Sequence, residues 1–251
     1  MQAGKVYLIG AGPGDPELMT LKAVRLLNSA DVVLVDDLVN RAVLAHARKD
    51  ARIIEVGKRG GCQSTPQEFI HRQMINEART GKVVARLKGG DPFMFGRGGE
   101  EIEALRAAGI PVEIVSGVTS GIAAPATLGI PVTHRNWAPG VTFVTGHTRD
   151  GNSVNWAALA AARTTLVIYM GIKNLPEIVA QLIEAGLPAS TPAAVIQNGT
   201  LAEQQHIKSS LGNLQAATQQ AGIGSPAIMV IGEVASLAHI ETCTEIAVKA
   251  A

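Results

Sequence analysis

The segment Gly89–Glu101, GGDPFMFGRGGEE, concentrates residue types that can do chemistry. Its paired glycines allow a backbone to approach a ligand closely, because they carry no Cβ. Asp91 can accept a hydrogen bond or balance a cation, and Arg97 can pair a carboxylate through two hydrogen bonds. The segment is therefore a candidate binding loop, and a plain turn that ends the apolar run Val83–Leu87 is the alternative interpretation.

A second glycine-rich segment, Gly10–Asp15, follows the apolar run Val6–Ile9. The dinucleotide fingerprint GxGxxG requires glycine at position 15, where this chain has aspartate, and a carboxylate there would repel a pyrophosphate. The Walker pattern GxxxxGK[ST] does not occur in the sequence. The segment is predicted either to approach a ligand through its backbone or to form a tight turn capped by Asp15.

The elements that position these loops alternate between strand and helix, which predicts a parallel sheet with covering helices in the first half of the chain. Expected strands are 6–9, 32–35, 53–56, 83–87 and 112–115, and expected helices run from Asp15 to about Asn28, from a capping box at Thr65 to Gly81, and over 99–108.

The second half repeats the alternation with different spacing. Expected strands are 141–145, 165–169, 194–197 and 227–231, and expected helices are 156–162, 176–185 and 211–221. The stretch between the halves is rich in Gly, Pro, Ser and Thr. We therefore expect an α/β domain at 1–115, a crossover segment at 116–139 and a second α/β domain at 140–251.

Composition narrows the function classes. The chain has 251 residues, 47% of them hydrophobic, 17% charged and 3% aromatic, with a formal charge of +1, so a packed core is expected and a nucleic-acid partner is disfavoured. Cys62 and Cys243 form no CxxC pair, which fits a reducing compartment. Without a signal-peptide pattern or an apolar run of about 20 residues, we expect a soluble, cytoplasmic protein with no membrane partner and no metal site.

Five segments in this order resemble the tetrapyrrole methylase family, and within it the members that act on uroporphyrinogen III. The resemblance covers nearly the whole chain; its GGDPFMFGRGGEE element is long and specific, whereas GPGDP fits many members. The segments are Val6–Thr20, Val33–Val39, Val56–Gly61, Arg86–Glu101 and Val115–Ala124.

The resemblance implies a two-domain α/β enzyme, a homodimer, with its active site in the cleft between the domains. S-adenosyl-L-methionine would be the methyl donor and S-adenosyl-L-homocysteine its product. The implied reaction is methylation of uroporphyrinogen III at C2 and C7, giving precorrin-2 via precorrin-1, for sirohaem, cobalamin or haem d1 synthesis. Because the first strand begins within a few residues of the start, the stand-alone form is expected rather than one with a dehydrogenase and chelatase region.

The resemblance also implies residue roles at the cofactor. Met170 on its own would more often be core filling, and Gly199 an ordinary turn. The implied cofactor contacts are Pro13, Gly89, Gly90, Asp91, Met94, Thr119, Ser120, Met170 and Gly199.

For catalysis, the resemblance implies Asp36 as proton acceptor and Lys58 as proton donor, with Arg97 and Glu100 at the substrate. An arginine has also been proposed as the base in this family, but its intrinsic pKa above about 12 argues against that role. We therefore interpret Arg97 as a clamp on substrate carboxylates or as a charge stabiliser. Orienting the nucleophile in line with the methyl can supply ~7–11 kcal/mol.

The substrate's eight carboxylates predict several arginine contacts. Arg97 and Arg135 are the main candidates, His147 is a further substrate contact, and Arg59 and Arg149 are weaker candidates that could equally be solvated surface. Asp37 departs from the basic or neutral residue common in relatives. Its carboxylate would repel an anionic substrate unless it points away.

Three alternatives remain. A methylase of a later precorrin, of diphthine or of ribosomal RNA would share the glycine loop, but FGRGGEE argues against it. A nicotinamide-dependent dehydrogenase is the second, and Asp36 could mimic its ribose-binding acid, but the broken GxGxxG argues against this. A non-catalytic ligand-binding module is the third, and the concentration of Gly, Arg, Asp and Lys in several loops disfavours it.

Overall fold

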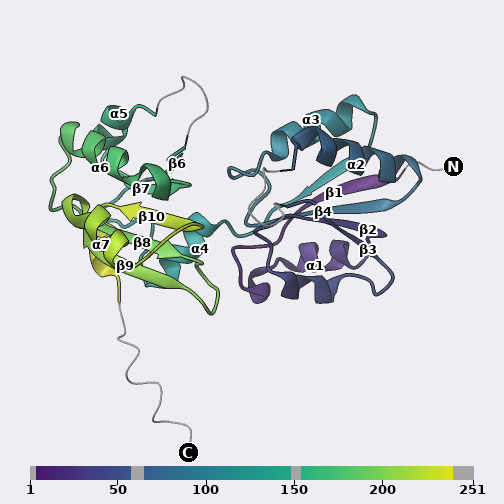
Figure 1. The fold of residues 1–251 in the computed structure, drawn as a ribbon, viewed down its shortest axis with the longest axis horizontal. Coiled ribbons are helices and arrows are strands. Elements are labelled where there is room, and N and C mark those ends of the chain that lie inside the picture. The colour runs from purple at the N-terminus through teal and green to yellow at the C-terminus, as the bar shows by residue number, and fades with distance from the viewer. Residues whose placement is uncertain (1–3, 58–64, 148–153, 240–251) are drawn as a thin grey trace, which may run out of the picture. The chain divides into compact units, whose positions relative to one another are not determined.

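The computed structural model describes residues 4–57, 65–147 and 154–239. The chain divides into two compact units: the first comprises the residues up to Ala123 together with Thr200–Ala202, and the second comprises the rest. Each unit is built on one five-stranded sheet (Figure 1). We call them the first unit and the second unit. The boundary at Ala123 falls inside the segment 116–139 that the sequence marks as a crossover.

The first sheet is parallel throughout, as the alternation of elements predicts. Its strand order is β3-β2-β4-β1-β5. The central strands are apolar because both faces of the sheet are covered, and all four residues of β2 are buried. The strands are β1 (Lys5–Gly10), β2 (Val32–Val35), β3 (Arg52–Glu55), β4 (Val83–Lys88) and β5 (Val112–Val115).

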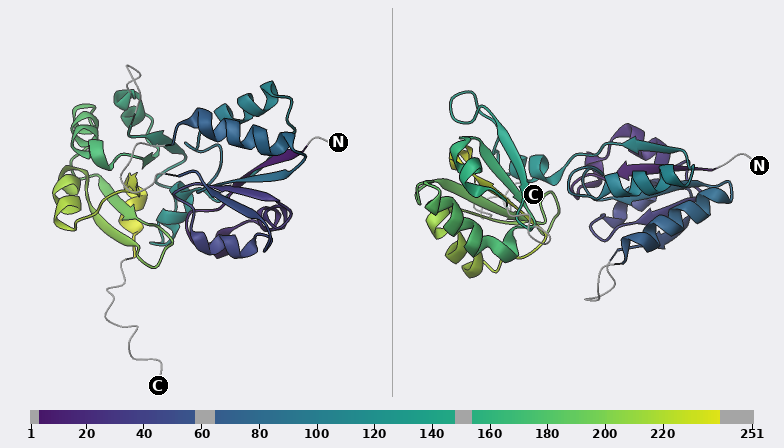
Figure 2. Two further views of the ribbon diagram at one scale, coloured as in Figure 1. Left: turned by 45° about the vertical axis from the view of Figure 1, so that its right-hand side comes forward. Right: turned by 90° about the horizontal axis from the view of Figure 1, so that it is seen from above.

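Three helices cover this sheet, with α1 (Leu21–Leu27) on one face and α2 (Gln67–Arg79) and α3 (Gly98–Ala107) on the other (Figures 1 and 2). Successive strand residues therefore enter different cores. Tyr7 and Ile9 of β1 pack in the cluster with the α1 side chains, whereas its Val6 and Leu8 pack in the cluster with α2 and α3.

The predicted helix from Asp15 to Asn28 is wrong in one respect, because it is broken. The Asp15 side chain accepts a hydrogen bond from the Glu17 N–H at 2.8 Å and caps only a short 3-10 turn, Pro16–Leu18. Met19 is extended, and α1 then begins at a second cap, where the Thr20 hydroxyl accepts from the Ala23 N–H at 3.1 Å. Local capping signals do not reveal how far each helix continues.

The predicted capping box at Thr65 is also wrong. Helix α2 follows Pro66 and has no side-chain cap. The Thr65 hydroxyl instead donates to the Gly57 carbonyl at 3.1 Å, so it fastens the chain to the loop after β3. Proline has no N–H, which leaves one fewer donor to cap at the start of the helix.

The second sheet is mixed. The second unit therefore does not repeat the parallel sheet of the first. Its order is β6-β7-β10-β8-β9, and only β6 and β7 pair in parallel. The polar edge strand β9 was not predicted from the sequence. The strands are β6 (Val141–Thr145), β7 (Thr165–Tyr169), β8 (Pro192–Gln197), β9 (Gln205–Ser210) and β10 (Ala227–Ile231).

Helices α5 (Trp156–Ala161), α6 (Leu175–Glu184) and α7 (Leu214–Gln220) pack with one face of this sheet in a single apolar cluster. A short helix, α4 (Ser120–Ala126), occupies part of the segment expected as a crossover. Among the described residues, no helix is both long and apolar enough to cross a bilayer.

Candidate active site

The parallel strands of the first unit bring several of the predicted site residues to one edge. Asp36 follows β2, Gly89 follows β4 and Ser116 follows β5, while Ala11 follows β1. The carboxyl ends of parallel strands meet at the same edge, and ligands of open α/β sheets bind outside it. We call these loops the strand-end edge.

Glycines allow three of these loops to pack backbone against backbone. The Gly90 N–H donates to the Gly12 carbonyl at 2.6 Å, and the Gly12 N–H donates back at 3.3 Å. A Cβ on Gly117 would lie 2.3 Å from the Gly90 carbonyl oxygen, and one on Gly10 would lie 2.6 Å from the same atom. The loops after β1, β4 and β5 therefore form one continuous surface.

Gly90 is needed for its backbone conformation rather than for lack of space. Its φ is +66°, in the left-handed region. A Cβ there would meet only ordinary contacts, the nearest being the Thr119 Cα at 3.8 Å and the Ser120 N at 3.9 Å. Three predicted cofactor residues thus lie together at the strand-end edge.

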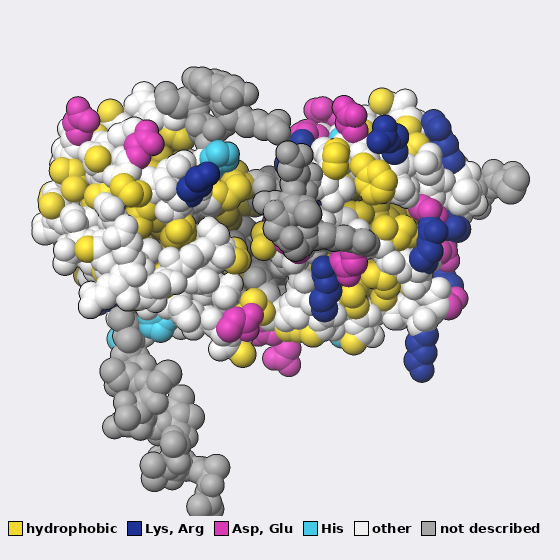
Figure 3. Space-filling model, in the orientation of Figure 1, with side chains coloured by type: hydrophobic (Ala, Val, Ile, Leu, Met, Phe, Trp, Pro, Cys, Tyr) yellow, Lys and Arg dark blue, Asp and Glu magenta, His cyan; other side chains and the backbone are white. Residues whose placement is uncertain are grey.

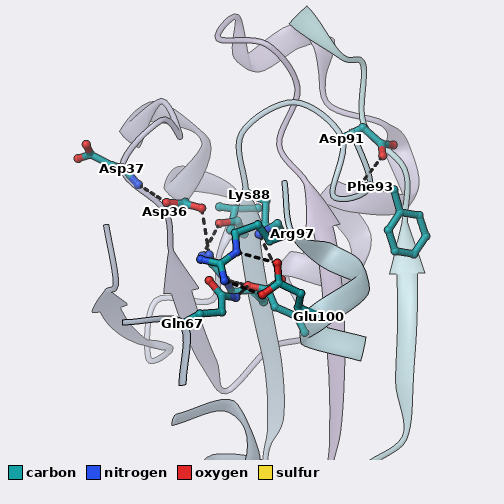
Figure 4. Close-up of polar contacts among 11 residues, drawn as sticks. Asp36, Asp37, Gln67, Lys88, Asp91, Phe93, Arg97 and Glu100 are labelled. Atoms are coloured by element: carbon teal, nitrogen blue, oxygen red, sulfur yellow. Dashed lines mark hydrogen bonds and ion pairs between the residues drawn. The ribbon is translucent and has the colours of Figure 1, made fainter. Parts of the chain in front are cut away.

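The Asp91 side chain links two of these loops by hydrogen bonds. One carboxylate oxygen accepts from the Phe93 N–H at 2.8 Å (Figure 4). The other accepts from the Gly117 N–H at 3.1 Å. Both oxygens thus bind backbone of the loops after β4 and β5. The plain-turn interpretation explains the Phe93 bond but not the bond to Gly117, which joins two loops.

Beneath the edge lies a buried group of charges that the sequence analysis did not identify as part of the site. Arg86 and Lys88 of β4 are 1% and 3% exposed, and Glu101 of α3 is fully buried. Arg86 pairs with Asp36, whose side chain is 35% exposed, so Asp36 is the accessible member (Figure 4). We call these four residues the buried ion cluster. Its two positive and two negative charges balance.

Arg86 lies at the centre of this cluster. Its Nε donates to Glu101 Oε1 at 3.0 Å, one terminal nitrogen donates to Asp36 Oδ2 at 2.9 Å, and the other donates to the Leu87 carbonyl at 3.3 Å. The sequence did contain a signal for this cluster. Arg86 and Lys88 interrupt an apolar strand at a spacing of two, so both side chains lie on the same face of the sheet.

The Glu101 carboxylate also interacts with Gln67 and Lys88. Gln67 of α2 donates to its Oε1 at 3.1 Å, and the Lys88 ammonium lies 3.2 Å from its Oε2. The Lys88 contact is an ion pair without the alignment of a hydrogen bond. Burial, together with the neighbouring Arg86 charge, lowers the pKa of Lys88, although Glu101 and Asp36 oppose that shift.

Asp36 is held ionised. Burial raises its pKa, but the charges of Arg86 and Lys88 and the hydrogen bond from the Asp37 N–H at 2.9 Å outweigh that effect, so the pKa is lowered overall. The exposed Asp37 carboxylate points away from the buried ion cluster (Figure 4).

Arg97 and Glu100 bind each other at the start of α3. The guanidinium donates twice to the carboxylate, from Nε to Oε1 at 2.9 Å and from a terminal nitrogen to Oε2 at 2.5 Å. Both side chains are about half exposed, at 44% and 51%. The pair raises the pKa of Arg97, which supports a clamp rather than a base.

Other predicted residues of the first unit are placed as follows. Pro13 and Met94 are half-buried in the loops after β1 and β4. Lys58 and the weaker candidate Arg59 lie outside the described residues, as does Arg149. Thr200, next to the predicted Gly199, belongs to the first unit, where its hydroxyl accepts from the Asp15 N–H at 3.0 Å.

The second unit brings three of the remaining residues to one edge of its sheet. His147, Met170 and Gly199 follow β6, β7 and β8, which all run in the same direction. Met170 is 50% exposed with a φ of +54°, so it is not core filling. Arg135 lies in an exposed turn ahead of β6, whereas His147 comes after that strand.

A Cβ on Gly199 would lie 2.5 Å from the Ala124 Cβ, so close packing with α4, beyond an ordinary turn, explains this glycine. The edge that carries Gly199 therefore lies against Ala124 of α4.

Comparisons with known proteins identify the family of this chain. The sequence profile of the family "Tetrapyrrole (Corrin/Porphyrin) Methylases" matches residues 5–215. A protein of Pseudomonas aeruginosa named uroporphyrinogen-III C-methyltransferase is 55% identical over 92% of this chain and 94% of its own length.

Two solved structures are similar across both units. The uroporphyrin-III C-methyl transferase of Thermus thermophilus complexed with S-adenyl homocysteine is 40% identical, with a TM-score of 0.80 over 93% of this chain and 100% of that one. A cobalt precorrin-4 methyltransferase is 30% identical, with a TM-score of 0.83 over 92% of this chain and 95% of that one. The chain therefore belongs to the tetrapyrrole methylases and has their two-domain α/β fold.

Proposed function

We propose that this chain transfers two methyl groups from S-adenosyl-L-methionine to uroporphyrinogen III, at C2 and C7, giving precorrin-2 via precorrin-1. The observation that carries the proposal is the 55% identity, over nearly the full length of both chains, to the uroporphyrinogen-III C-methyltransferase of Pseudomonas aeruginosa. The product would serve sirohaem, cobalamin or haem d1 synthesis.

The strand-end edge of the first unit suits the methyl donor. Gly90 presents backbone rather than a side chain there, with Thr119 and Ser120 beside it. Asp91 keeps these loops together and adds negative charge near a cationic sulfonium. We therefore assign the contacts with S-adenosyl-L-methionine in this unit to Pro13, Gly89, Gly90, Asp91, Met94, Thr119 and Ser120. When bound, this molecule supplies an electrophilic methyl group.

Arg97 would orient the substrate through one of its carboxylates. Glu100 holds the guanidinium in place, and the half-exposed Arg97 side chain is accessible to a second partner. Because orientation alone can contribute ~7–11 kcal/mol to such a reaction, a fixed clamp is worth more than a mobile cation.

Asp36 is our candidate for the anion at the reacting ring. A pyrrole carbon that forms a bond to the methyl group becomes part of a cationic ring, which must then lose a proton. An ionised carboxylate stabilises that cation and can accept the proton, and the lowered pKa of Asp36 keeps it ionised at neutral pH. The counterpart proton donor, Lys58, stays a prediction.

The remaining proposed ligand contacts lie in the second unit. We propose Met170 and Gly199 as further cofactor contacts and Arg135 and His147 as further substrate contacts, all of them on exposed or half-buried positions. A homodimer, a cleft between the domains and a cytoplasmic location stay predictions.

The direct test is to incubate the purified protein with methyl-labelled S-adenosyl-L-methionine and uroporphyrinogen III, and to count the methyl groups in the product by mass spectrometry. We expect two labelled methyl groups and, after oxidation, absorbance like that of sirohydrochlorin. The variant Asp36→Asn, which keeps the shape of the side chain and removes its charge, should be strongly impaired.

The structure is also similar to that of a cobalt precorrin-4 methyltransferase, so a later precorrin is the alternative substrate to test. A second reaction mixture contains such a precorrin in place of uroporphyrinogen III. Methylation of the later precorrin alone would reassign the substrate within the family. No methyl transfer to any tetrapyrrole would refute the proposed function altogether.

A further inference from the structure

Arg86 is a buried cation whose position is explained by neither the fold nor the proposed ligands. It lies on β4, 1% exposed, in a strand whose other central residues are apolar. An isolated buried charge is costly, so a buried guanidinium needs partners that satisfy it. Its partners are a glutamate with no exposure, Glu101, and the accessible Asp36.

The contacts of Arg86 orient its guanidinium. The Glu101 carboxylate binds the Nε side at 3.0 Å, and the Leu87 carbonyl binds one terminal nitrogen at 3.3 Å. Gln67 donates to the same Glu101 oxygen, which limits the rotation of that carboxylate. The remaining terminal nitrogen is then directed at Asp36.

The Asp36 carboxylate is consequently held from two sides. Arg86 binds its Oδ2 at 2.9 Å, and the Asp37 N–H binds its Oδ1 at 2.9 Å. A side chain that is one-third exposed would otherwise sample several rotamers. The arrangement therefore prescribes one orientation for a carboxylate at the strand-end edge.

We propose that Arg86 and Glu101 are positioning residues for Asp36: the buried pair fixes the orientation of this carboxylate while it acts on the substrate. The adjacent Arg86 charge also favours its anionic form. This inference rests on the proposed function, in which Asp36 faces the reacting ring. Neither positioning residue needs to touch substrate, since both are buried.

The charges around Asp36 determine the direction of the pH effect. Arg86 and Lys88 of β4 are the nearby cations, and Glu101 of α3 is the nearby anion. Arg41 donates to the Asp36 backbone carbonyl at 2.9 Å and pairs with Glu55 of β3. Beyond Glu101, the half-buried His71 of α2 has a lowered pKa, owing to burial. Without the Arg86 charge, Glu101 would face Asp36 with only Lys88 to balance both.

The test compares the pH dependence of kcat/KM for the wild type, Arg86→Gln and Arg86→Lys, each as the full chain. For Arg86→Gln, the acid limb should move to higher pH by about 1 unit or more, because an adjacent opposite charge lowers a carboxyl pKa by ~1–3 units. Arg86→Lys should move it less, and activity in both should recover toward higher pH. Arg106→Gln, at an exposed arginine near the end of α3, should leave the profile unchanged.

A loss of kcat/KM that is equal at every pH, with an unmoved acid limb, would overturn the inference and leave Arg86 a structural residue. A second measurement does not depend on the folding of Arg86→Gln. The carboxyl carbons of isotope-labelled aspartate are titrated by NMR in the wild type, and the Asp36 signal is identified by its loss in Asp36→Asn. Titration below the ordinary aspartate value of about 3.9 supports the inference, and titration at or above it contradicts it.

These outcomes separate the inference from the proposed function. A wild type without methyl transfer would refute the proposed function, while the NMR titration would still report whether the folded protein holds Asp36 ionised. An active wild type whose Asp36 titrates normally would refute the positioning role alone.

Discussion

Arg97 and Glu100 form a surface pair whose interaction would contribute more to the proposed recognition of substrate than to folding. Exposed ion pairs stabilise a folded protein by only about 0–1 kcal/mol, and both of these side chains are about half exposed. Their double hydrogen bond does, however, fix where the guanidinium lies before substrate arrives. Such preorganisation reduces the side-chain entropy lost on binding.

Arg97→Ala should therefore lower turnover without weakening cofactor binding. We expect kcat/KM for the tetrapyrrole to fall by about 10- to 100-fold, the loss of one charged hydrogen-bonded pair of ~1.5–3 kcal/mol. The dissociation constant of S-adenosyl-L-homocysteine, measured by calorimetry, and the melting temperature should stay unchanged. Arg106→Ala, on the same helix, is the matched control. Equal losses in turnover and cofactor affinity would place Arg97 in the cofactor pocket instead.

Among individual residues, the sequence identifies site candidates whose side-chain type and motif indicate their chemistry. It misses residues whose roles depend on being buried. Gly90 and Arg97 stand in a motif that indicates close backbone approach and carboxylate binding, and the structure places them where such roles are feasible. Glu101 looks like an ordinary charged residue in the sequence, and the position of Arg86 within an apolar strand is the only sign of its burial. The fold is needed to show that the two side chains pair and that Arg86 also binds Asp36.

The strand-end edge depends on how closely the loops after β1, β4 and β5 can pack. Gly10 ends β1, while Gly90 and Gly117 lie in the loops after β4 and β5, and a Cβ on either Gly10 or Gly117 would collide with the Gly90 carbonyl oxygen. A collision in such a region cannot be relieved by turning a side chain, because the atoms met are backbone atoms. These loops are therefore the most sensitive part of the site to added volume.

Gly117→Ala should destabilise the first unit, because its new methyl group would lie 2.3 Å from the Gly90 carbonyl oxygen. Overpacking of this kind costs about 1–3 kcal/mol. Gly99→Ala is the matched control: a Cβ at this position in α3 meets no atom within 4 Å, and alanine favours a helix by about 0.5–1 kcal/mol.

Urea unfolding of both variants should be followed by far-UV circular dichroism, since the two tryptophans, Trp137 and Trp156, lie in the second unit. Gly117→Ala should unfold at lower urea than the wild type, and Gly99→Ala at equal or higher urea. If Gly117→Ala unfolded with the wild type, the close packing of these loops would be contradicted.

The elements themselves could be predicted where an apolar run stands between turn residues. The bounds of β2, β5, β6, β7 and β10 agree with the sequence prediction. For β2, β7 and β10 the reason is burial, because strands covered on both faces are rich in apolar residues. The edge strand β9, QHIKSS, has no such signal, since one side of it lacks a neighbour and its residues are half-buried or exposed. Its absence from the prediction also hid the antiparallel pairings of the second sheet.

At the scale of the whole molecule, the net charge is small, and the basic side chains that the structure describes on the visible face form no large patch (Figure 3). The net charge is +1, and on the face shown in Figure 3 the basic side chains lie singly or in small groups among acidic and hydrophobic ones. A general electrostatic attraction of a polyanionic substrate would need a larger positive excess. The proposed function therefore depends on a few individually positioned arginines.

The claim on which this account depends is that the strand-end edge of the first unit holds the methyl donor, with Asp36 turned toward the reacting ring. A crystal structure of the protein with S-adenosyl-L-homocysteine tests it most directly. The account predicts that the ligand contacts the backbone at Gly90 and the residues Thr119 and Ser120, with the Asp36 carboxylate still bound to Arg86. S-adenosyl-L-homocysteine bound away from these loops, or an Asp36 side chain detached from Arg86 in the complex, would contradict it.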